Sequence, residues 1–457
     1  MTFSSSEFLF VFLPAVLIFY FLPVKNMTYK NAVLLVFSLL FYAWGEPVYV
    51  FGLVLLSFID WLLAERMKQG RKGLLVFTVI LNLAILFVFK YLNFITGNIA
   101  ALTGNESIQT HISMPLGISF IIFQLLSYVF DVYRGRIEHD RNFFHVLLYV
   151  TLFPQLIEGP IVRYETVQKE LYDRHVSMQA FSTGMCRFIR GLARKVLVAD
   201  VVGMLADTVY GYDASLLSTA GAWLGSIAYM LQIYFDFAGY SDMALGLSSM
   251  FGFTLEENFM YPYQSHSVSE FWRRWHISMG TWFRDYVYFP LGGSRVKKGR
   301  MLFNLFVVWV LTGIWHGADW TFLLWGLMHF CVLAVEKLTG MDKGKGFLNV
   351  VWTLFSVNLG WVFFRADSVN SAFTYLKAMF FHARAGMITA GTVDLFHQFG
   401  WILFIGIVVC AMEGKDFWKK DTKMNNILFV VVHLLLALLS IAAVVKGGND
   451  PFIYASF

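Results

Sequence analysis

Residues 427–445 read ILFVVVHLLLALLSIAAVV, a run that contains no charged side chain. About 20 apolar residues are enough for a helix to cross the hydrocarbon core of a bilayer. The run follows Asn425 and Asn426 and ends before Lys446, and such polar residues suit the two membrane surfaces. It therefore predicts a membrane-spanning helix over residues 425–446.

The composition of the whole chain agrees with a lipid environment. The chain has 457 residues, of which 58% are hydrophobic and 14% are charged. A soluble domain has about 25% charged residues, so this chain does not have the composition of a water-soluble protein. The net charge of +5 is modest, and no basic tail or dense basic patch stands apart from the apolar segments. We therefore expect membrane lipid and not nucleic acid as a partner.

Apolar segments recur along the chain, and Pro154, Gly159 and Pro160 interrupt one of them. Broken segments are tolerated at membrane depth where protein or a water cavity covers the backbone. We expect an all-α, multi-pass membrane protein with about 11 spans and further re-entrant or interfacial pieces, in one domain over residues 1–457. The candidate ranges are 7–23, 31–45, 48–65, 73–95, 115–131, 143–158, 218–237, 238–253, 301–318, 320–338, 347–365, 393–412 and 425–446.

Basic loops predict the orientation. Lys and Arg residues follow the first, third and fifth apolar segments and recur in residues 415–423, which places these loops in the cytoplasm and the N-terminus outside. Residues 180–200 and 267–300 mix basic with apolar side chains, and we expect both segments to lie in the membrane interface. Three cysteines have neither disulfide nor zinc spacing, so Cys186, Cys331 and Cys410 are expected to be small buried apolar residues.

The common motifs of soluble enzymes are absent, and polar residues inside apolar sequence are the stronger functional signal. The first such cluster is Thr312–Trp320, which joins two apolar segments and contains Trp315 and His316. A neutral imidazole at a helix break can take a proton from an alcohol near neutral pH. A packed core histidine is the alternative for His316. His433, alone in its apolar helix, is expected to be packed in the core, and whether His329 meets His316 is left open.

The second cluster combines Phe271–His276 with Trp282–Tyr286, and its arginines stand next to tryptophans. Arginine binds phosphates in a forked geometry, so Arg273, Arg274 and Arg284 are candidates for a ligand such as coenzyme A. Lipid-headgroup anchors are the alternative for the same residues.

The third cluster, Tyr234–Asp242, places Asp236 and Asp242 between two apolar runs. These acids are expected at a helix break, where they would orient a histidine, pair with an arginine or form a structural ion pair.

At these residues the chain resembles the membrane-bound O-acyltransferase superfamily, and within it the alginate O-acetyltransferase branch. The likeness runs over most of the chain. It is carried by Met114–Phe120, Phe153–Ile161, Tyr234–Met243, Ser269–Gly293, Trp315–Trp320, Trp361–Arg365 and Pro451–Tyr454.

The resemblance implies a catalytic histidine at His316 and a second functional histidine at His276. The candidates for substrate binding are Trp315, Trp275, Arg273, Arg274, Arg284, Asp236 and Asp242. It implies a helical bundle that is thin at its centre, with funnels from both faces, in the bacterial inner membrane. Acetyl-CoA is the expected donor substrate, and neither a metal nor a bound cofactor is expected. The acceptor is an extracytoplasmic partner protein that acetylates a polysaccharide.

Several alternatives stay open. Glu158 stands where alanine is more usual before the Gly-Pro pair of the alginate proteins, so a different acceptor is one alternative. D-alanyl transfer to teichoic acid is a related activity. A transporter also has many spans and broken helices, although no internal repeat is visible here. A non-catalytic scaffold subunit of polysaccharide export is a third possibility.

Overall fold

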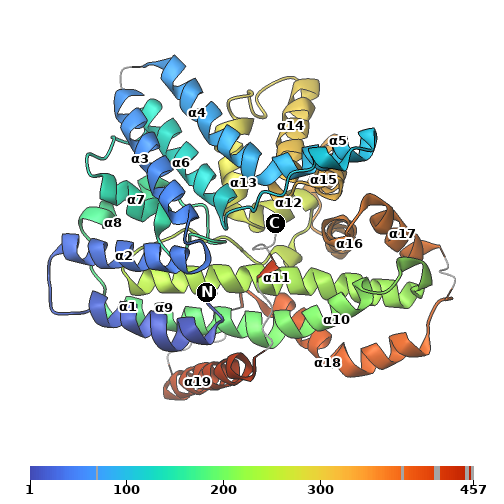
Figure 1. Ribbon diagram of the computed structural model, residues 1–457. Helices are drawn as coiled ribbons and strands as arrows, with labels where there is room; N and C mark the ends of the chain where they lie inside the picture. Colours follow the sequence, from blue (N-terminus) through green and yellow to red (C-terminus); the bar gives the residue numbers. More distant parts are fainter. Residues whose placement is uncertain (68–69, 382–384, 416–421, 448–451, 454–457) are drawn as a thin grey trace. The chain divides into compact units, whose positions relative to one another are not determined.

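The computed structural model of the chain describes residues 1–67, 70–381, 385–415, 422–447 and 452–453 (Figure 1). Within these ranges the regular elements are all helices and no residue lies in a strand, which confirms the predicted all-α class. Most of the basic stretch 415–423 lies outside the described residues. Of the motif at 451–454, only Phe452 and Ile453 are described.

The chain is a multi-pass membrane protein. In the described ranges, six helices are long and apolar enough to cross a bilayer, and Phe8–Tyr20 and Ile118–Tyr133 are shorter apolar helices. The count of about 11 spans stays a prediction. The six candidate spans are Met27–Gly45, Lys72–Thr103, Trp320–Thr339, Phe347–Arg365, Ala390–Met412 and Met424–Lys446.

The contacts divide the chain into two compact units, and the expectation of one domain over residues 1–457 stays a prediction. Of the described residues, unit 1 contains 1–67, 70–188 and 241–256. Its elements are η1 (Phe8–Phe12), α1 (Leu13–Tyr20), α2 (Met27–Gly45), α3 (Tyr49–Met67), α4 (Lys72–Leu86), η2 (Phe87–Tyr91), α5 (Leu92–Thr103), η3 (Glu106–Ile108), α6 (Ile118–Tyr133), α7 (Phe143–Thr151), α8 (Tyr164–Tyr172) and most of α9 (Met178–Ala193). Two of them, η1 and η2, are π-helical turns, and η2 joins α4 to α5.

Of the described residues, unit 2 contains 189–240, 257–381, 385–415, 422–447 and 452–453. The long helix α11 (Thr219–Met250) contributes residues to both units. The other elements of unit 2 are η4 (Arg194–Ala199), α10 (Asp200–Tyr210), η5 (Ala214–Leu216), η6 (Pro262–Gln264), α12 (Val268–Arg274), α13 (Ile277–Phe283), η7 (Arg284–Tyr288), α14 (Lys298–His316), α15 (Trp320–Thr339), η8 (Met341–Lys343), α16 (Phe347–Arg365), α17 (Val369–Phe380), α18 (Ala390–Met412) and α19 (Lys423–Lys446).

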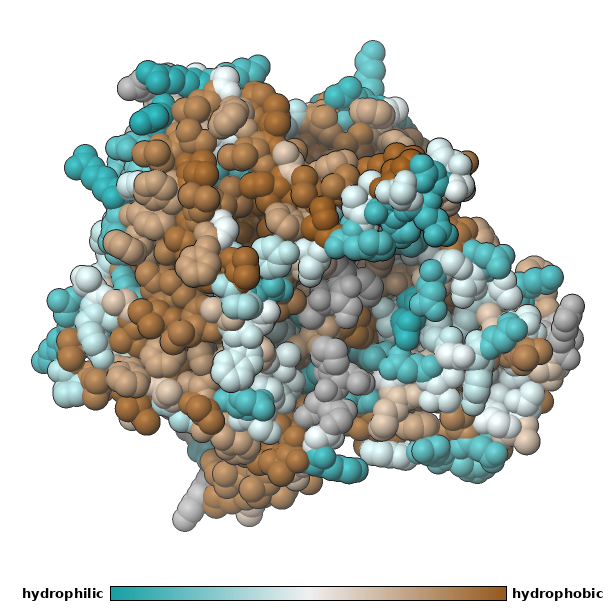
Figure 2. All heavy atoms as spheres, in the orientation of Figure 1, coloured by the Kyte–Doolittle hydropathy of each residue, from teal (hydrophilic) through white to brown (hydrophobic). Residues whose placement is uncertain are grey.

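In unit 1, apolar side chains cover the outer faces of α3 and α4, as Figure 2 shows. Phe51 and Leu55 of α3 and Phe77 and Ile80 of α4 are among the exposed large apolar residues. In water such a surface would be a strong site for association. In a bilayer it is the surface that contacts lipid.

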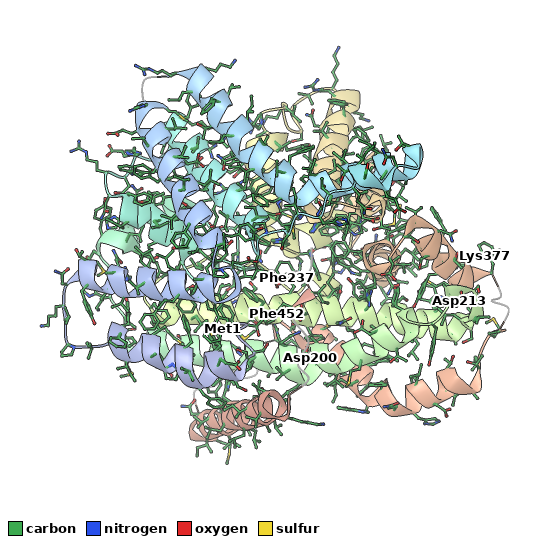
Figure 3. The ribbon with its side chains drawn as sticks, in the orientation of Figure 1. Met1, Asp200, Asp213, Phe237, Lys377 and Phe452 are labelled. Carbon is green, nitrogen blue, oxygen red and sulfur yellow. The ribbon has the colours of Figure 1, made fainter. Side chains whose placement is uncertain are left out.

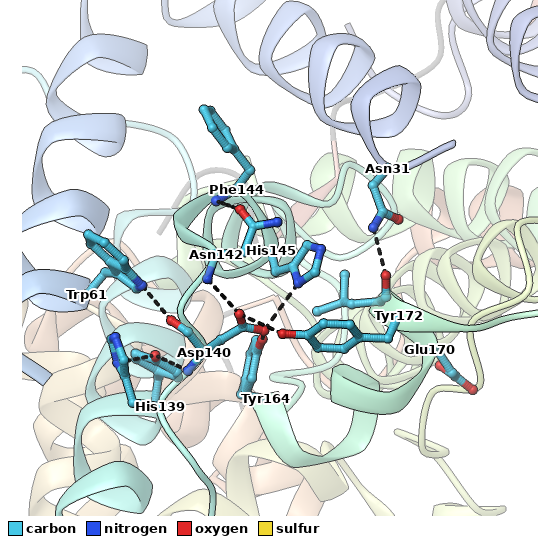
Figure 4. Close-up of polar contacts among 12 residues, drawn as sticks. Asn31, Trp61, His139, Asp140, Asn142, Phe144, His145, Tyr164, Glu170 and Tyr172 are labelled. Atoms are coloured by element: carbon cyan, nitrogen blue, oxygen red, sulfur yellow. Dashed lines mark hydrogen bonds and ion pairs between the residues drawn. The ribbon is translucent and has the colours of Figure 1, made fainter. Parts of the chain in front are cut away.

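Asp140 organises the polar interior of unit 1 (Figure 4). Its carboxylate accepts hydrogen bonds from Tyr164, from Tyr172 at 2.8 Å and from the Asn142 N–H at 2.8 Å, and His145 Nδ1 lies 3.2 Å away. These partners come from α7, α8 and the loop before α7. The Asp140 side chain therefore joins α7, α8 and the loop before α7 through hydrogen bonds.

Three expectations from the sequence need correction. The apolar runs 218–237 and 238–253 were expected as separate segments with a break at Asp236–Asp242, but α11 is continuous from Thr219 to Met250. No proline interrupts it, and a Cβ at Gly239 would lie 2.8 Å from the carbonyl oxygen of Gly191, so this glycine serves close packing instead of a break. Cys331 is exposed and Cys186 is half-buried, so only Cys410 is buried as expected.

Other boundaries agree with the sequence. The segment around Pro154 and Gly159 is interrupted as expected: α7 ends at Thr151 and residues 152–163 form turns and extended chain. His433 is buried, and its Nδ1 lies 2.8 Å from the carbonyl oxygen of Phe429 one turn earlier.

Candidate functional site

His316 is the last residue of α14 and is almost fully buried, with 3% of its surface exposed. Three aromatic rings surround its imidazole. The ring centroids of Trp315, Trp325 and Phe364 lie 5.0, 4.9 and 5.3 Å from that of His316. Trp325 and Phe364 are nearly perpendicular to the imidazole, at 84° and 75°. The histidine therefore lies at a helix end within a cluster of aromatic rings in unit 2.

Glycines explain how α14 and α15 approach each other at this point. A Cβ at Gly326 would lie 2.5 Å from the carbonyl oxygen of Trp309, and one at Gly313 would lie 2.6 Å from that of Phe322. Both positions exclude a side chain, so the two backbones pack directly together. The helix pair therefore holds Trp325 of α15 against His316 of α14.

The turn after His316 is equally restricted. Gly317 is extended (φ −162°), and a Cβ there would lie 2.1 Å from the ring of Phe322. The Asp319 carboxylate then caps α15 by accepting a hydrogen bond from the Thr321 N–H at 2.9 Å, as acidic N-cap residues do. The sequence Gly317–Asp319 thus ends one helix and starts the next within a very short turn.

His276 joins α12 to α13 and is fully buried. Its backbone is in the left-handed region (φ 45°), which is uncommon for a residue other than glycine. The ring centroid lies 6.0 Å from that of Trp315 and 4.7 Å from that of Phe237. Trp315 therefore contacts both candidate histidines, and the structure brings His276, Trp315 and His316 into one cluster.

Asn258 fixes the orientation of His276. The amide oxygen of Asn258 accepts hydrogen bonds from the Ser278 N–H at 3.2 Å and the Ser278 hydroxyl at 2.9 Å. His276 Nδ1 lies 3.3 Å from the same oxygen, so Nδ1 is the donor and the neutral ring carries its lone pair on Nε2. Burial lowers the pKa of His276, which lies outside the candidate spans, to about 3. The neutral imidazole is the form present at neutral pH.

The three candidate arginines differ in their surroundings. Arg273 of α12 is exposed and forms no ion pair with any residue that the structure describes. Arg274 pairs with Glu270 one turn earlier at 2.7 Å, and Arg284 pairs with its neighbour Asp285 at 2.9 Å. Arg273 is thus the most accessible of the three to a phosphate.

Trp275 and the two candidate acids occupy structural positions. Trp275 is buried and packs against Trp361 at 5.0 Å between ring centroids. Asp236 forms a buried ion pair with Lys195 at 2.7 Å in unit 2. Asp242 pairs with Arg187 at 2.9 Å in unit 1. Their roles in substrate binding stay predictions.

Sequence reasoning missed Trp325 and Lys195, and it left open whether His329 meets His316. His329 lies one turn after Trp325 on α15 and is fully buried, and the Trp325 ring contacts both His316 and His329. The spacing of Trp325 and His329, four residues apart, is the signal that could have placed both side chains on one helix face. Nothing in the sequence around Lys195 marks it as the partner of Asp236.

No group of three or more His, Cys, Asp or Glu side chains that could hold a metal ion occurs in the part of the chain that the structure describes. The absence of a metal from the mechanism stays a prediction.

Comparison with known proteins identifies the family. Residues 78–341 match the family model of the membrane-bound O-acyltransferases. The chain is 41% identical to a probable alginate O-acetylase of Pseudomonas putida over the full length of both proteins. It is 34% identical to a peptidoglycan O-acetyltransferase of Helicobacter pylori, over 82% of this chain and 79% of the relative. A more distant match is a teichoic acid D-alanyltransferase of Bacillus subtilis, 29% identical over 47% of this chain and 56% of the relative.

The fold and the buried histidine cluster agree with this assignment. The match to the acyltransferase family and to relatives named as an acetylase and an acetyltransferase favours an enzyme over the transporter and scaffold alternatives. The chain belongs to the membrane-bound O-acyltransferase family, in its alginate O-acetylase branch, and is an O-acyltransferase.

Proposed function

We propose that the enzyme transfers an acetyl group from cytoplasmic acetyl-CoA for the O-acetylation of a polysaccharide outside the cytoplasm, through an extracytoplasmic partner protein. The names of the relatives from Pseudomonas putida and Helicobacter pylori, an alginate O-acetylase and a peptidoglycan O-acetyltransferase, support this choice. The chain would act in the bacterial inner membrane as one domain of about 11 spans, with funnels from both faces that meet at the site.

The observation that carries the proposal is the position of His316. Its imidazole is buried at the junction of α14 and α15, and three aromatic rings enclose it. A neutral imidazole in such a place can remove the proton of an acceptor hydroxyl. It can instead carry the acetyl group briefly on a ring nitrogen. His276 contributes a second imidazole, which contacts Trp315 beside His316.

Arginine side chains supply the chemistry for the donor. Coenzyme A carries a 3′-phosphate and a diphosphate, and guanidinium groups bind such anions through paired hydrogen bonds. Arg273 is exposed and forms no ion pair with a described residue, so it can meet a phosphate without breaking an existing contact. Arg274 and Arg284 would have to exchange their carboxylate partners for the ligand.

D-alanyl transfer to teichoic acid is the second candidate, because a D-alanyltransferase of Bacillus subtilis also matches the chain. That match covers 47% of this chain, whereas the alginate O-acetylase of Pseudomonas putida covers all of it at higher identity. The difference favours acetyl transfer.

The test compares ester-linked acetate on the cell-surface polysaccharide of cells that express the wild type, His316→Ala or His433→Ala at matched membrane abundance. His433 is a suitable control because it is also buried, and its Nδ1 is engaged with a carbonyl oxygen of its own helix. Loss of a general base lowers the rate about 10²–10⁴-fold. We expect acetate to disappear with His316→Ala and to persist with His433→Ala.

Two other outcomes would change the conclusion. Normal acetate in His316→Ala cells would make this histidine structural and reject its proposed role. Ester-linked D-alanine on the surface polymer of wild-type cells, without ester-linked acetate, would favour the second candidate.

A further inference from the structure

The indole of Trp325 lies beside His316 in the interior of unit 2. Trp325 lies on α15 and none of its surface is exposed. Its ring centroid is 4.9 Å from that of His316, with an angle of 84° between the rings. An acyl group bound to His316, or attacked by an acceptor that His316 deprotonates, would therefore lie next to the Trp325 ring.

The indole N–H has no acceptor within the described part of the chain. Trp325 Nε1 is buried, and no described residue accepts a hydrogen bond from it. A buried donor without an acceptor carries a free-energy cost, and most buried polar groups in proteins are satisfied. Phenylalanine would fill an apolar site without that cost. A donor retained here suggests that its acceptor is a bound group.

Neighbouring rings hold the indole in place. His329, Trp309 and Phe364 have ring centroids 5.0, 5.7 and 5.5 Å from that of Trp325. Trp361 is stacked on it with an angle of 22°. A donor fixed in this way needs no rearrangement when charge develops near it, which is the condition for effective electrostatic stabilisation of a transition state.

We propose that the Trp325 Nε1–H donates a hydrogen bond to the acyl carbonyl oxygen when the tetrahedral intermediate forms beside His316. This inference rests on the proposed function, and it adds Trp325 as a catalytic residue that contacts the reacting group. The ligand class is a thioester carbonyl, whose oxygen becomes an oxyanion during transfer.

The chemical step balances as follows. The acceptor oxygen forms a bond to the carbonyl carbon while His316 takes the proton of the acceptor hydroxyl. The electron pair of the C=O π bond moves to the oxygen, where the Trp325 N–H stabilises the negative charge. The C=O bond then re-forms, the C–S bond breaks, and His316 returns the proton to the departing sulfur. The products are an O-acyl ester and a free thiol.

The experiment removes the N–H and keeps the ring. Trp325→Phe is compared with Trp309→Phe, because Trp309 is buried in the same cluster and contacts Trp325 and His329. The full chain is assayed in membrane vesicles that contain its extracytoplasmic partner protein and its polymer acceptor, with acetyl-CoA as donor and release of free thiol as readout. Replacement of Trp325 by 3-benzothienylalanine, which has the same shape with sulfur in place of N–H, is the second variant in case phenylalanine disturbs folding.

We expect kcat to fall about 10²–10³-fold in both Trp325 variants, the usual effect of losing one oxyanion donor, with little change in the KM for acetyl-CoA. Trp309→Phe should stay within a few-fold of the wild type. Near-normal kcat in the benzothienylalanine variant would overturn the proposal, even if His316→Ala is inactive. Normal activity of His316→Ala would instead reject the role of His316 in the proposed function.

Discussion

Lys195 Nζ lies 2.7 Å from a carboxylate oxygen of Asp236 and 2.7 Å from one of Asp200, and this lysine is 2% exposed. The other oxygen of Asp236 accepts a hydrogen bond from the Ile453 N–H at 2.8 Å. The ring of Phe452, labelled with Asp200 in Figure 3, lies 4.8 Å from Lys195 Nζ. One lysine therefore links α11, α10 and residues near the C-terminus within unit 2.

The ion pair predicts unequal effects of removing its two ends. Lys195→Met leaves two carboxylates facing each other in the interior, whereas Asp236→Asn still leaves Lys195 paired with Asp200. Breaking a buried pair from one side costs about 3–5 kcal/mol. We expect Lys195→Met to approach this cost and Asp236→Asn to cost clearly less. Unfolding midpoints in detergent measure both, and an equal loss in the two variants would contradict the prediction.

Replacing His276 with asparagine should separate its backbone role from its chemical role. Asn tolerates the left-handed conformation at this position (φ 45°), whereas alanine does not without strain of about 1–3 kcal/mol. We expect His276→Asn to keep the unfolding midpoint of the wild type and to lose at least about 10²-fold in transfer rate. His276→Ala should lose both. An active His276→Asn enzyme would show that the imidazole does no chemistry.

Gly317→Ala should displace His316 while leaving the His316 side chain itself unchanged. The added methyl group would lie 2.1 Å from the ring of Phe322, a contact that forces one of the two to move. Overpacking of this kind costs about 1–3 kcal/mol. We expect a lower unfolding midpoint and reduced transfer, with partial recovery in Gly317→Ala/Phe322→Leu. Gly299→Ala is the control, because a Cβ at Gly299 meets no atom within 4 Å.

Arg273→Ala should weaken binding of the acyl donor more than it slows the chemical step. A lost charge-assisted hydrogen bond is worth about 1.5–3 kcal/mol, so the KM for acetyl-CoA is expected to rise about 10-fold or more with a small change in kcat. Lys343→Ala, which removes another exposed cation of unit 2, is the control. An unchanged KM in Arg273→Ala would remove this arginine from the donor site.

Asp140 gives a pH dependence that can be measured. Burial would raise its pKa, but the hydrogen bonds from His145, Tyr164, the Asn142 N–H and Tyr172 outweigh burial and lower the pKa to about 2. The folded pKa is below the usual value of about 3.9, so the stabilisation is present above that value and is lost as the pH falls toward 2.

Asp140→Asn should therefore lower the unfolding midpoint at pH 7, with a free-energy cost of about 1–3 kcal/mol from disrupted hydrogen bonds. The difference between the variant and the wild type should shrink as the pH falls from about 4 to 2, because the wild-type carboxylate then gains its proton as well. A difference that is the same at pH 7 and pH 3 would mean that the charge of Asp140 does not stabilise the fold.

The sequence predicted which segments are helical better than it predicted where the helices are interrupted. Runs such as 427–445 have only one stable form in a bilayer, because a helix satisfies its own backbone hydrogen bonds. The expected break near Asp236 and Asp242 was wrong, because acids inside an apolar helix can be paired by side chains from elsewhere, here Lys195 and Arg187. Such partners lie far away in sequence, and local pattern carries no information about them.

The same limit applies to the site. His316 and His276 stand out in sequence because each lies in a motif rich in tryptophan and glycine. Their shared contact with Trp315 and the fit of Trp325 against His316 depend on tertiary packing, which the glycines at 313 and 326 permit. Composition could mark the histidines but could not show which rings surround them.

The tryptophans near His316 also give the protein an optical signature. Trp272, Trp275, Trp309, Trp325 and Trp361 form a chain of contacts with ring centroids 5.0 to 6.2 Å apart. Indoles at such distances share their electronic excitation, and near-ultraviolet circular dichroism reports fixed tertiary packing of aromatic groups. A donor or acceptor substrate that binds beside His316 changes the surroundings of these coupled indoles. We therefore expect the near-ultraviolet circular dichroism of the enzyme to report occupancy of its reaction centre without an attached dye.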